Sequence, residues 1–292
     1  MTRRDFLVLM ICCLGWGGNF VVSSWALASN PVPPFMLAAV RASFVILIMG
    51  YFLLKPLPKK FGLLLIVCVL VGPVHLACLY TGLQSASATG SSIVAQFFIP
   101  MGTILSVIFL REKVGWIRGG AIVGAFIGVI IMIYDPASFA LDIGLIYVLI
   151  AYLALAVASI IMKSVGDVPW QQYVVWMAVV VLITMGGTSA LFETGHAQIV
   201  ASSLAPLLIA AIYGAVGVTI IAHGQYFDLI KRYEVSLIVP LTLMVPVFAT
   251  VLGVIFLKDE LYTRYFIGAA LILPCVYVIS RRMKTASVLD KE

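Results

Sequence analysis

Polar and aromatic side chains recur at helical spacing within otherwise apolar stretches of this 292-residue sequence. Trp16 and Asn19 share one helical face because they are three residues apart, and Thr219 and His223 do so at a spacing of four. Lipid offers no hydrogen-bond partner, so such a face must contact protein or water. Two interpretations stay open, a binding pathway and ordinary hydrogen bonds between helices. The candidates for lining a pathway are Trp16, Asn19, Tyr80, Gln84, Gln96, Tyr152, Tyr213 and His223.

Three side chains in the apolar stretches can carry or gain a charge. Arg41 is permanently charged, and its planar guanidinium matches the geometry of a carboxylate, so it is a candidate for holding an anionic ligand group. The alternative is structural, with the side chain reaching toward the membrane surface or binding carbonyl groups at a helix end. His75 and His223 are the groups in these stretches that we expect to titrate near neutrality.

Motifs of common enzymes and ion-driven pumps are missing from the sequence. No Asp or Glu lies deep in an apolar stretch, although proton and sodium relays usually depend on such carboxylates. There is no phosphate-binding Walker loop, HExxH zinc motif or GxSxG nucleophile elbow, and the five cysteines lack metal-binding spacing. We therefore expect no catalytic residue, no metal, no cofactor and no obligatory proton or sodium gradient.

The elements that position these residues are expected to be membrane-spanning helices. The composition is 63% apolar and 10% charged with a mean hydropathy of +1.16, whereas a soluble domain has about 25% charged residues. Apolar runs of about 20 residues, each able to cross the hydrocarbon layer as a helix, follow one another with short breaks. The predicted spans are 5–28, 33–54, 61–83, 89–110, 114–134, 141–162, 170–191, 204–226, 235–257 and 262–279. This pattern predicts an all-α polytopic membrane protein of about ten transmembrane helices.

Basic residues indicate which side of the membrane each loop faces. With both termini in the cytoplasm, fifteen of the 18 Lys and Arg residues lie on the inner side, Lys258 and Arg264 lie outside, and Arg41 lies within a span. This asymmetry follows the positive-inside rule. We therefore expect a multi-pass protein of the inner (cytoplasmic) membrane with both termini cytoplasmic. The net charge of +6 then reflects topology and does not indicate nucleic-acid binding.

A weak internal repeat relates the two halves of the chain. Val107–Leu110 and Val254–Leu257 have the same sequence, and Glu112 and Glu260 each stand eight residues before a glycine. Each half contains five spans, and an odd number gives the second half an inverted topology. The expected organisation is a first five-helix repeat, a second and inverted five-helix repeat, and a cytoplasmic tail, over 1–136, 137–284 and 285–292 of one membrane domain. Inverted repeats place a central pathway between the halves and allow two mirror-related access states.

Glycines on the fifth predicted span repeat at a spacing of four. Gly120, Gly124 and Gly128 form a double GxxxG pattern. Small residues at this spacing let the backbones of two membrane helices approach closely. We expect this face to pack on another helix of the same chain.

Several short motifs, in this order, carry a resemblance to a known family. They are Trp16-Gly17-Gly18-Asn19-Phe20, Pro33-Pro34 followed by Arg41, Tyr80-Thr81-Gly82-Leu83, the small residues of 85–92, and the two acid-ended repeats. Together the sequence resembles, over essentially its whole length, the drug/metabolite transporter superfamily and specifically its EamA-type ten-helix exporters. The resemblance is greatest to amino-acid exporters, including those for aromatic amino acids (the YddG type) and for cysteine-related metabolites. Lys231-Arg232-Tyr233-Glu234 departs from the small residues of the family before the ninth helix.

The resemblance implies a transporter, not an enzyme. It would export amino acids, aromatic or other apolar ones included, or related small metabolites by alternating access through a central cavity. A multidrug or nucleotide-sugar carrier of the same superfamily is the alternative within transport, and a membrane-embedded enzyme and a receptor or scaffold are alternatives of other classes. The expected partners are a small-molecule substrate and the lipid bilayer, with no nucleic acid. Oligomeric state, transport direction and exact substrate stay open.

Overall fold

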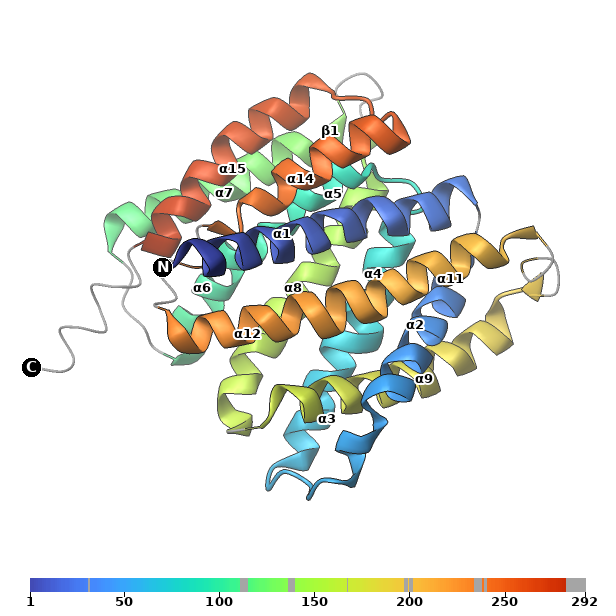
Figure 1. The fold of residues 1–292 in the computed structure, drawn as a ribbon. Helices are drawn as coiled ribbons and strands as arrows, with labels where there is room; N and C mark the ends of the chain where they lie inside the picture. The colour runs from blue at the N-terminus through green and yellow to red at the C-terminus, as the bar shows by residue number, and fades with distance from the viewer. Residues whose placement is uncertain are drawn as a thin grey trace, which may run out of the picture.

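The computed structural model describes residues 1–30, 32–110, 115–135, 140–166, 168–196, 199, 202–233, 238 and 241–281. Over these residues the chain is almost entirely helical (Figure 1), with one two-stranded hairpin of β1 (Tyr134–Asp135) and β2 (Ala140–Leu141). Seven described helices are long and apolar enough to cross a membrane, and three apolar helices are shorter. Each of the ten corresponds to one predicted span. The prediction of an all-α polytopic membrane protein is therefore confirmed.

Most spans are built from more than one helical piece. The first half contains α1 (Arg3–Ser24), η1 (Trp25–Ser29), α2 (Pro34–Met49), η2 (Gly50–Leu54), α3 (Phe61–Val69), η3 (Leu70–Val74), α4 (His75–Gly82), α5 (Ala88–Ala95), α6 (Phe98–Leu110) and α7 (Trp116–Ile133). The second half contains α8 (Ile143–Val165), α9 (Trp170–Phe192), α11 (Leu204–Ile212), η4 (Tyr213–Ala222), α12 (His223–Arg232), α14 (Met244–Leu252), η5 (Gly253–Leu257) and α15 (Thr263–Arg281). The predicted tail, 285–292, lies outside the described residues.

Prolines account for two of the irregular positions. Pro73 lies inside η3, which is a π-helical turn. Proline has no N–H and its ring clashes with the preceding turn, so the helix widens there. Pro100 lies at the start of α6, where its missing N–H leaves the Gln96 carbonyl without its α-helical partner. That carbonyl accepts instead from the Ile99 N–H at 3.2 Å, and the fourth span is broken between α5 and α6.

Helices of the two halves pack in corresponding pairs. The first helix of the first half, α1, packs on η4 and α14, and the first helix of the second half, α8, packs on α4 and α6. In addition α2 packs on α9, and α7 on α15 (Figure 1). Each of these six pairings joins an element of the first half to one of the second, and α8 on α6 is the counterpart of α1 on α14.

The glycine face of α7 packs on α15. A Cβ added at Gly128 would lie 2.7 Å from Ile272 Cγ1, and one added at Gly124 would lie 2.8 Å from Cys275 Sγ. Such distances allow no side chain, so the predicted close approach to a helix of the same chain is confirmed at these two positions. At Gly120 no atom would lie within 4 Å of an added Cβ. Among the residues that the structure describes, the close approach is therefore seen at Gly124 and Gly128 and not at Gly120.

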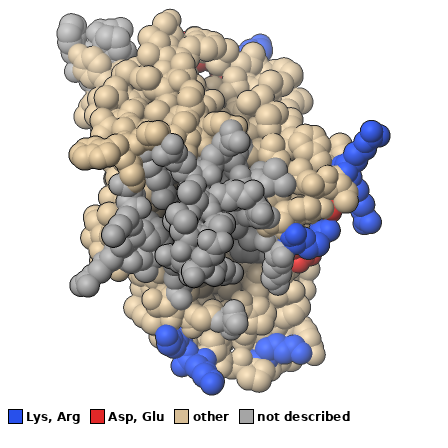
Figure 2. Space-filling view, turned by 90° about the vertical axis from the view of Figure 1, so that its left-hand side faces the viewer, with Lys and Arg blue, Asp and Glu red and all other residues tan. Residues whose placement is uncertain are grey.

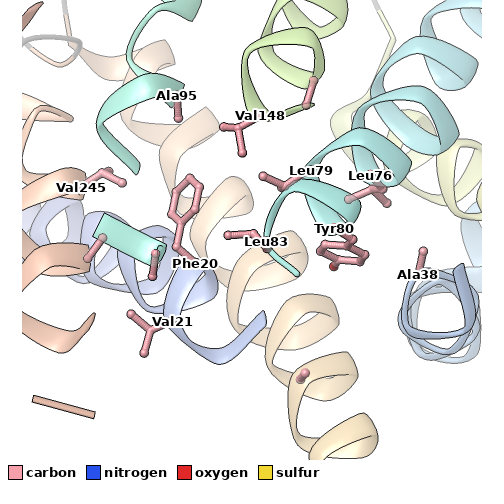
Figure 3. Close-up of a cluster of buried hydrophobic side chains, with 14 of the residues drawn as sticks. Phe20, Val21, Ala38, Leu76, Leu79, Tyr80, Leu83, Ala95, Val148 and Val245 are labelled. Carbon is pink, nitrogen blue, oxygen red and sulfur yellow. The ribbon is translucent and has the colours of Figure 1, made fainter. Parts of the chain in front are cut away.

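Buried apolar side chains from both halves fill the centre of the bundle (Figure 3). They include Phe20 of α1, Leu79 of α4, Val148 of α8 and Val245 of α14. Tyr80 lies at the edge of this cluster, on the side that faces α2 (Figure 3). The outer surface between the helix ends is apolar, as contact with lipid requires. Figure 2 views the end that carries the N-terminus, where the described Lys and Arg side chains stand in separate small groups.

Candidate functional site

Arg41 of α2 lies at the centre of a buried hydrogen-bonded cluster. Its side chain is 9% exposed. Nη1 donates to the hydroxyl of Tyr80 at 2.9 Å, and Nη2 donates to the hydroxyl of Thr219 at 2.9 Å. Tyr80 comes from α4 in the first half and Thr219 from η4 in the second. One guanidinium therefore joins three spans across the interface of the two halves.

The π-helical segment η4 shapes the surface on which Arg41 lies. A Cβ added at Gly214 would lie 2.9 Å from Arg41 Cδ, 3.0 Å from Nε and 3.1 Å from Cζ, so only glycine admits the side chain here. The Thr219 hydroxyl donates to the Gly214 carbonyl at 2.9 Å. These two residues are five apart, a spacing that one π-helical turn brings to the same side. Because its hydrogen is used in this bond, Thr219 presents a lone pair to Arg41.

Two histidines, each packed against an aromatic ring, flank this cluster. The ring centroids of His223 and Trp16 are 5.4 Å apart, and those of His75 and Tyr152 are 5.1 Å apart in a perpendicular arrangement. His75 and Tyr80 belong to the same helix, α4, and His223 follows Thr219 by four residues at the end of η4, so both histidines lie next to the partners of Arg41 in their own spans. The structure thus brings together residues that the sequence could only assign to separate helical faces.

The two histidine pairs correspond to one another across the halves. His75 follows the π-helical turn η3, and His223 follows η4. Each packs against a residue from the first helix of the opposite half, Tyr152 of α8 for His75 and Trp16 of α1 for His223. The Nδ1 atoms lie 3.0 Å and 2.9 Å from the carbonyl oxygens of Ala151 and Val218. A carbonyl can only accept, so Nδ1 carries a hydrogen in each ring and Nε2 is the acceptor of the neutral form.

Three of the remaining candidates are buried or half-buried near the interface. The hydroxyl of Tyr213 donates to the carbonyl of Gly15 at 3.0 Å and so ties η4 to α1. Asn19 of α1 is buried, and Gln96 is buried at the break between α5 and α6. Among the described residues the indole N–H of Trp16 is buried without a hydrogen-bond partner. It is an unused donor beside His223.

Gln84 lies apart from the other candidates. The helix α4 ends at Gly82, and Gln84 is exposed in the turn that follows. Its N–H bonds to the Thr81 carbonyl at 3.3 Å, three residues back, so the helical spacing that linked it to Tyr80 has already ended. The predicted shared face does not extend to this residue. Thr219 and Gly214, by contrast, belong to the cluster, although neither was among the predicted site residues. Glycines are so common in apolar helices that the sequence alone could not single out Gly214.

At one end of the molecule, carboxylates of the second half cap helices of the first. The two carboxylate oxygens of Glu193 accept from the N–H groups of Phe35 and Met36, at 2.8 Å and 2.9 Å, in the first turn of α2. Asp259 accepts from both the N–H and the hydroxyl of Thr89, each at 2.9 Å, at the start of α5. Free N–H groups and the helix dipole both favour an anion at these positions.

Two acids stand side by side in the second repeat motif, and they make different contacts. Glu260 is exposed and accepts from the Tyr262 hydroxyl at 2.6 Å, whereas its neighbour Asp259 makes the contact between halves. The corresponding acid of the first half, Glu112, lies outside the described residues. The sequence thus reveals the repeat, but it does not reveal which of Asp259 and Glu260 makes the contact between the halves.

At the opposite end, Asp5 links α1 to α12. Its carboxylate is nearly buried and accepts from Arg232 Nη1 at 2.9 Å and from the Tyr233 hydroxyl at 2.7 Å. Arg232 and Tyr233 belong to the segment that departs from the family pattern, and they have a structural role here. A cleft of about 310 Å³ opens beside this contact, lined by Thr2, Arg4, Asp5, Val8, Gln225 and Arg232. In the described part of the chain no group of three His, Cys, Asp or Glu side chains could hold a metal ion.

Comparisons with known proteins place this arrangement in a family. The model of the EamA-like transporter family matches residues 4–134 and 142–281. Proteins of Escherichia coli (strain K12) and Salmonella typhimurium (strain LT2), each named as a probable amino-acid metabolite efflux pump, are 25% and 26% identical to this chain over 95% of both partners. A solved crystal structure with a TM-score of 0.64 is 19% identical and covers 98% of this chain and 100% of its own, which shows a shared fold.

The family match extends over nearly the whole chain, and the structure supplies the apolar helices that a membrane transporter needs. The protein is a multi-pass membrane transporter and not an enzyme. It belongs to the EamA-like transporter family.

Proposed function

We propose that this transporter exports amino acids, apolar and aromatic ones included, or related small metabolites by alternating access through a pathway between its two halves. The observation that carries the proposal is the Arg41 cluster, where a buried cation, Tyr80 and Thr219 meet from both halves. A charge at this depth is costly in a membrane protein unless it serves a ligand or a structural link. The names of the two bacterial relatives support amino-acid metabolites as the substrate class.

The two halves form inverted five-helix repeats in this proposal. The corresponding helix pairs support it, since α1 on η4 has its counterpart in α8 on α4, and α2 on α9 joins equivalent helices. The two matched segments, 4–134 and 142–281, lie close to the predicted halves 1–136 and 137–284 and support it independently. Halves of this kind can exchange conformations, and each exchange opens the pathway to the other side of the membrane.

The pathway is lined by the two histidine pairs and the Arg41 cluster. Trp16 and Tyr152 supply rings against which an apolar side chain can pack, and the guanidinium, hydroxyls and imidazoles supply polar contacts. A few polar groups placed in apolar surroundings are typical of small-molecule sites. Gln96 and Asn19 extend the polar lining toward α5 and along α1, whereas Gln84 at the end of α4 is available only to a ligand entering or leaving.

Contacts between the halves at both ends act as gates. Glu193 and Asp259 join them at one end, and Asp5 joins them at the other through Arg232 and Tyr233. Alternating access requires one set to separate while the other holds. In this proposal the Asp5 end and both termini face the cytoplasm of a cell whose inner membrane holds the protein, and the distribution of basic residues supports this orientation.

Flux measurements in proteoliposomes test the proposal. Purified protein is reconstituted, and the movement of labelled L-phenylalanine, L-leucine and L-cysteine is followed, with protein-free liposomes as the control. We expect saturable flux of at least one amino acid, recovered chemically unchanged. Flux of ethidium or UDP-glucose without flux of any amino acid supports the multidrug or nucleotide-sugar carrier instead. Conversion of the label to a product contradicts a transporter.

A further inference from the structure

We propose that Arg41 binds the carboxylate of the transported molecule, and that Tyr80 and Thr219 are positioning residues that hold its guanidinium for this purpose. The inference rests on the proposed function and narrows the substrate to molecules with a free carboxylate. The sequence leaves open whether Arg41 binds a ligand or stabilises the fold, since an arginine within a span can do either.

Within the part of the chain that the structure describes, Arg41 is a buried cation with no carboxylate partner. Its hydrogen-bond acceptors among the described residues are two neutral hydroxyls, and none of the ion pairs in this part of the chain includes it. The sequence places no Asp or Glu deep in any predicted span that could neutralise it. A buried charge that lacks an opposite charge is strongly unfavourable. An anion that enters the pathway therefore gains by pairing with Arg41.

The guanidinium has donors left for such an anion. It carries five N–H groups in a planar fork, and the bonds to Tyr80 and Thr219 use one on Nη1 and one on Nη2. Three N–H groups remain, and a carboxylate needs two neighbouring ones for a bidentate contact. A lysine in this place would offer a point charge without this geometry.

The two hydroxyls fix the direction of the fork without reducing its charge. Tyr80 is 1% exposed and Thr219 is 3% exposed, so packing restricts both. The Thr219 hydrogen goes to the Gly214 carbonyl, which leaves this oxygen to accept from Arg41. A purely structural arginine is better served by a carboxylate partner, which would also compete with the substrate. The neutral hydroxyls of Tyr80 and Thr219 orient the guanidinium and leave its positive charge available to an anionic ligand.

Competition between an acid and its amide tests the inference. Transport of labelled L-phenylalanine is measured in proteoliposomes against unlabelled L-phenylalanine and L-phenylalaninamide, with L-leucine and L-leucinamide as a second pair. In the wild-type protein we expect the acid to compete about tenfold or more better than the amide, because the amide cannot form the charged bidentate contact. In Arg41→Gln we expect KM for the acid to rise about tenfold and the preference for the acid to fall below about threefold.

Variants of the positioning residues separate recognition from folding. Thr219→Val and Tyr80→Phe keep shape but remove the acceptor, so KM for the acid should rise about three- to tenfold while Vmax changes little. Thr219→Ser keeps the hydroxyl and should restore the wild-type KM. Equal competition by acid and amide in the wild type overturns the inference, as does an unchanged KM in Thr219→Val. Wild-type protein without saturable flux of any amino acid overturns the proposed function itself, and the carboxylate assignment with it.

Discussion

Gly214 sets the space that the Arg41 side chain occupies. Its α-carbon lies so close to the guanidinium that an added Cβ would be 2.9 Å from Cδ and 3.0 Å from Nε. Gly217 is three residues later in the same π-helical segment, and there the nearest neighbour of an added Cβ, Tyr213 Cδ2, is 3.8 Å away. A methyl group added at Gly214 would therefore collide with Arg41, whereas one added at Gly217 would make ordinary van der Waals contact.

Gly214→Ala should displace Arg41 and reduce amino-acid flux about tenfold at low substrate concentration, since a misplaced binding group costs affinity. Gly217→Ala is the matched control and should retain wild-type flux within about twofold. Flux in proteoliposomes is measured at equal amounts of monodisperse protein. Equal fluxes of the two variants would contradict the role given to Gly214.

Asp259 and Glu260 are adjacent acids with different contacts. Asp259 caps α5 through Thr89, whereas Glu260 is exposed and bonded to Tyr262. The N-cap residue of α5 is Ser87, and Asp259 adds a charge-assisted hydrogen bond to an N–H group of the first turn, worth about 1 kcal/mol. Asp259→Ala should therefore lower the melting temperature in detergent by a few degrees, and Glu260→Ala should change the stability by less than about 0.5 kcal/mol. A melting temperature for Asp259→Ala that is equal to or higher than that of Glu260→Ala would contradict a stabilising role for the contact between Asp259 and Thr89.

At the scale of helices, the number and order of spans can be read from the sequence, but their irregular pieces cannot. Long apolar runs are set by the thickness of the membrane, which is why 61–83 was predicted and Phe61–Gly82 was found. The π-helical turn at Pro73 and the break before Pro100 were not predicted. A proline permits a kink, a π turn or a break, and the packing partners decide which of these forms.

The sequence predicted which side chains share a polar face of one helix, but it could not predict which of them touch between helices. Helical spacing placed Trp16 and His223 on polar faces of their own spans, yet no spacing within one helix reveals that these rings meet across the two halves. Gln84 does not share a helical face with Tyr80 because α4 ends two residues before it, and helix ends are poorly marked in an apolar sequence rich in small residues. Gly214 carried no signal, because its importance comes from a residue 173 positions away in sequence (Arg41).

We expect the same substitution at two glycines of α7 to have unequal effects, because only one of the two lies against described atoms of α15. Gly128→Leu places its side chain against Ile272 and the Gly268 backbone, so it should overpack the contact and abolish folding or lower stability by about 1–3 kcal/mol or more. Gly120→Leu meets no atom within 4 Å and should fold normally. Expression and size-exclusion profiles of both variants check the prediction. Normal folding of Gly128→Leu would contradict the close packing of the two helices.

For the molecule as a whole, the basic residues predict its orientation. Lys59 and Glu260 are both exposed and lie in loops that the positive-inside rule assigns to opposite sides. In intact cells a membrane-impermeant maleimide should label Glu260→Cys but not Lys59→Cys, which should react only after permeabilisation. The five native cysteines are buried or half-buried and give little background. Labelling of Lys59→Cys from outside would reverse the topology and exchange the two gates.

Counterflow tests the central claim most directly, that a carboxylate-bearing metabolite crosses by alternating access between the two halves. Proteoliposomes are loaded with excess unlabelled L-phenylalanine and diluted into a trace of labelled L-phenylalanine, with no proton or sodium gradient. Because a carrier returns with its substrate bound, the label should accumulate transiently above its equilibrium level. A protonophore should not abolish this overshoot, since no deep carboxylate is present in the predicted spans to couple a proton. Simple equilibration of the label, or an overshoot that disappears with the protonophore, would contradict the account.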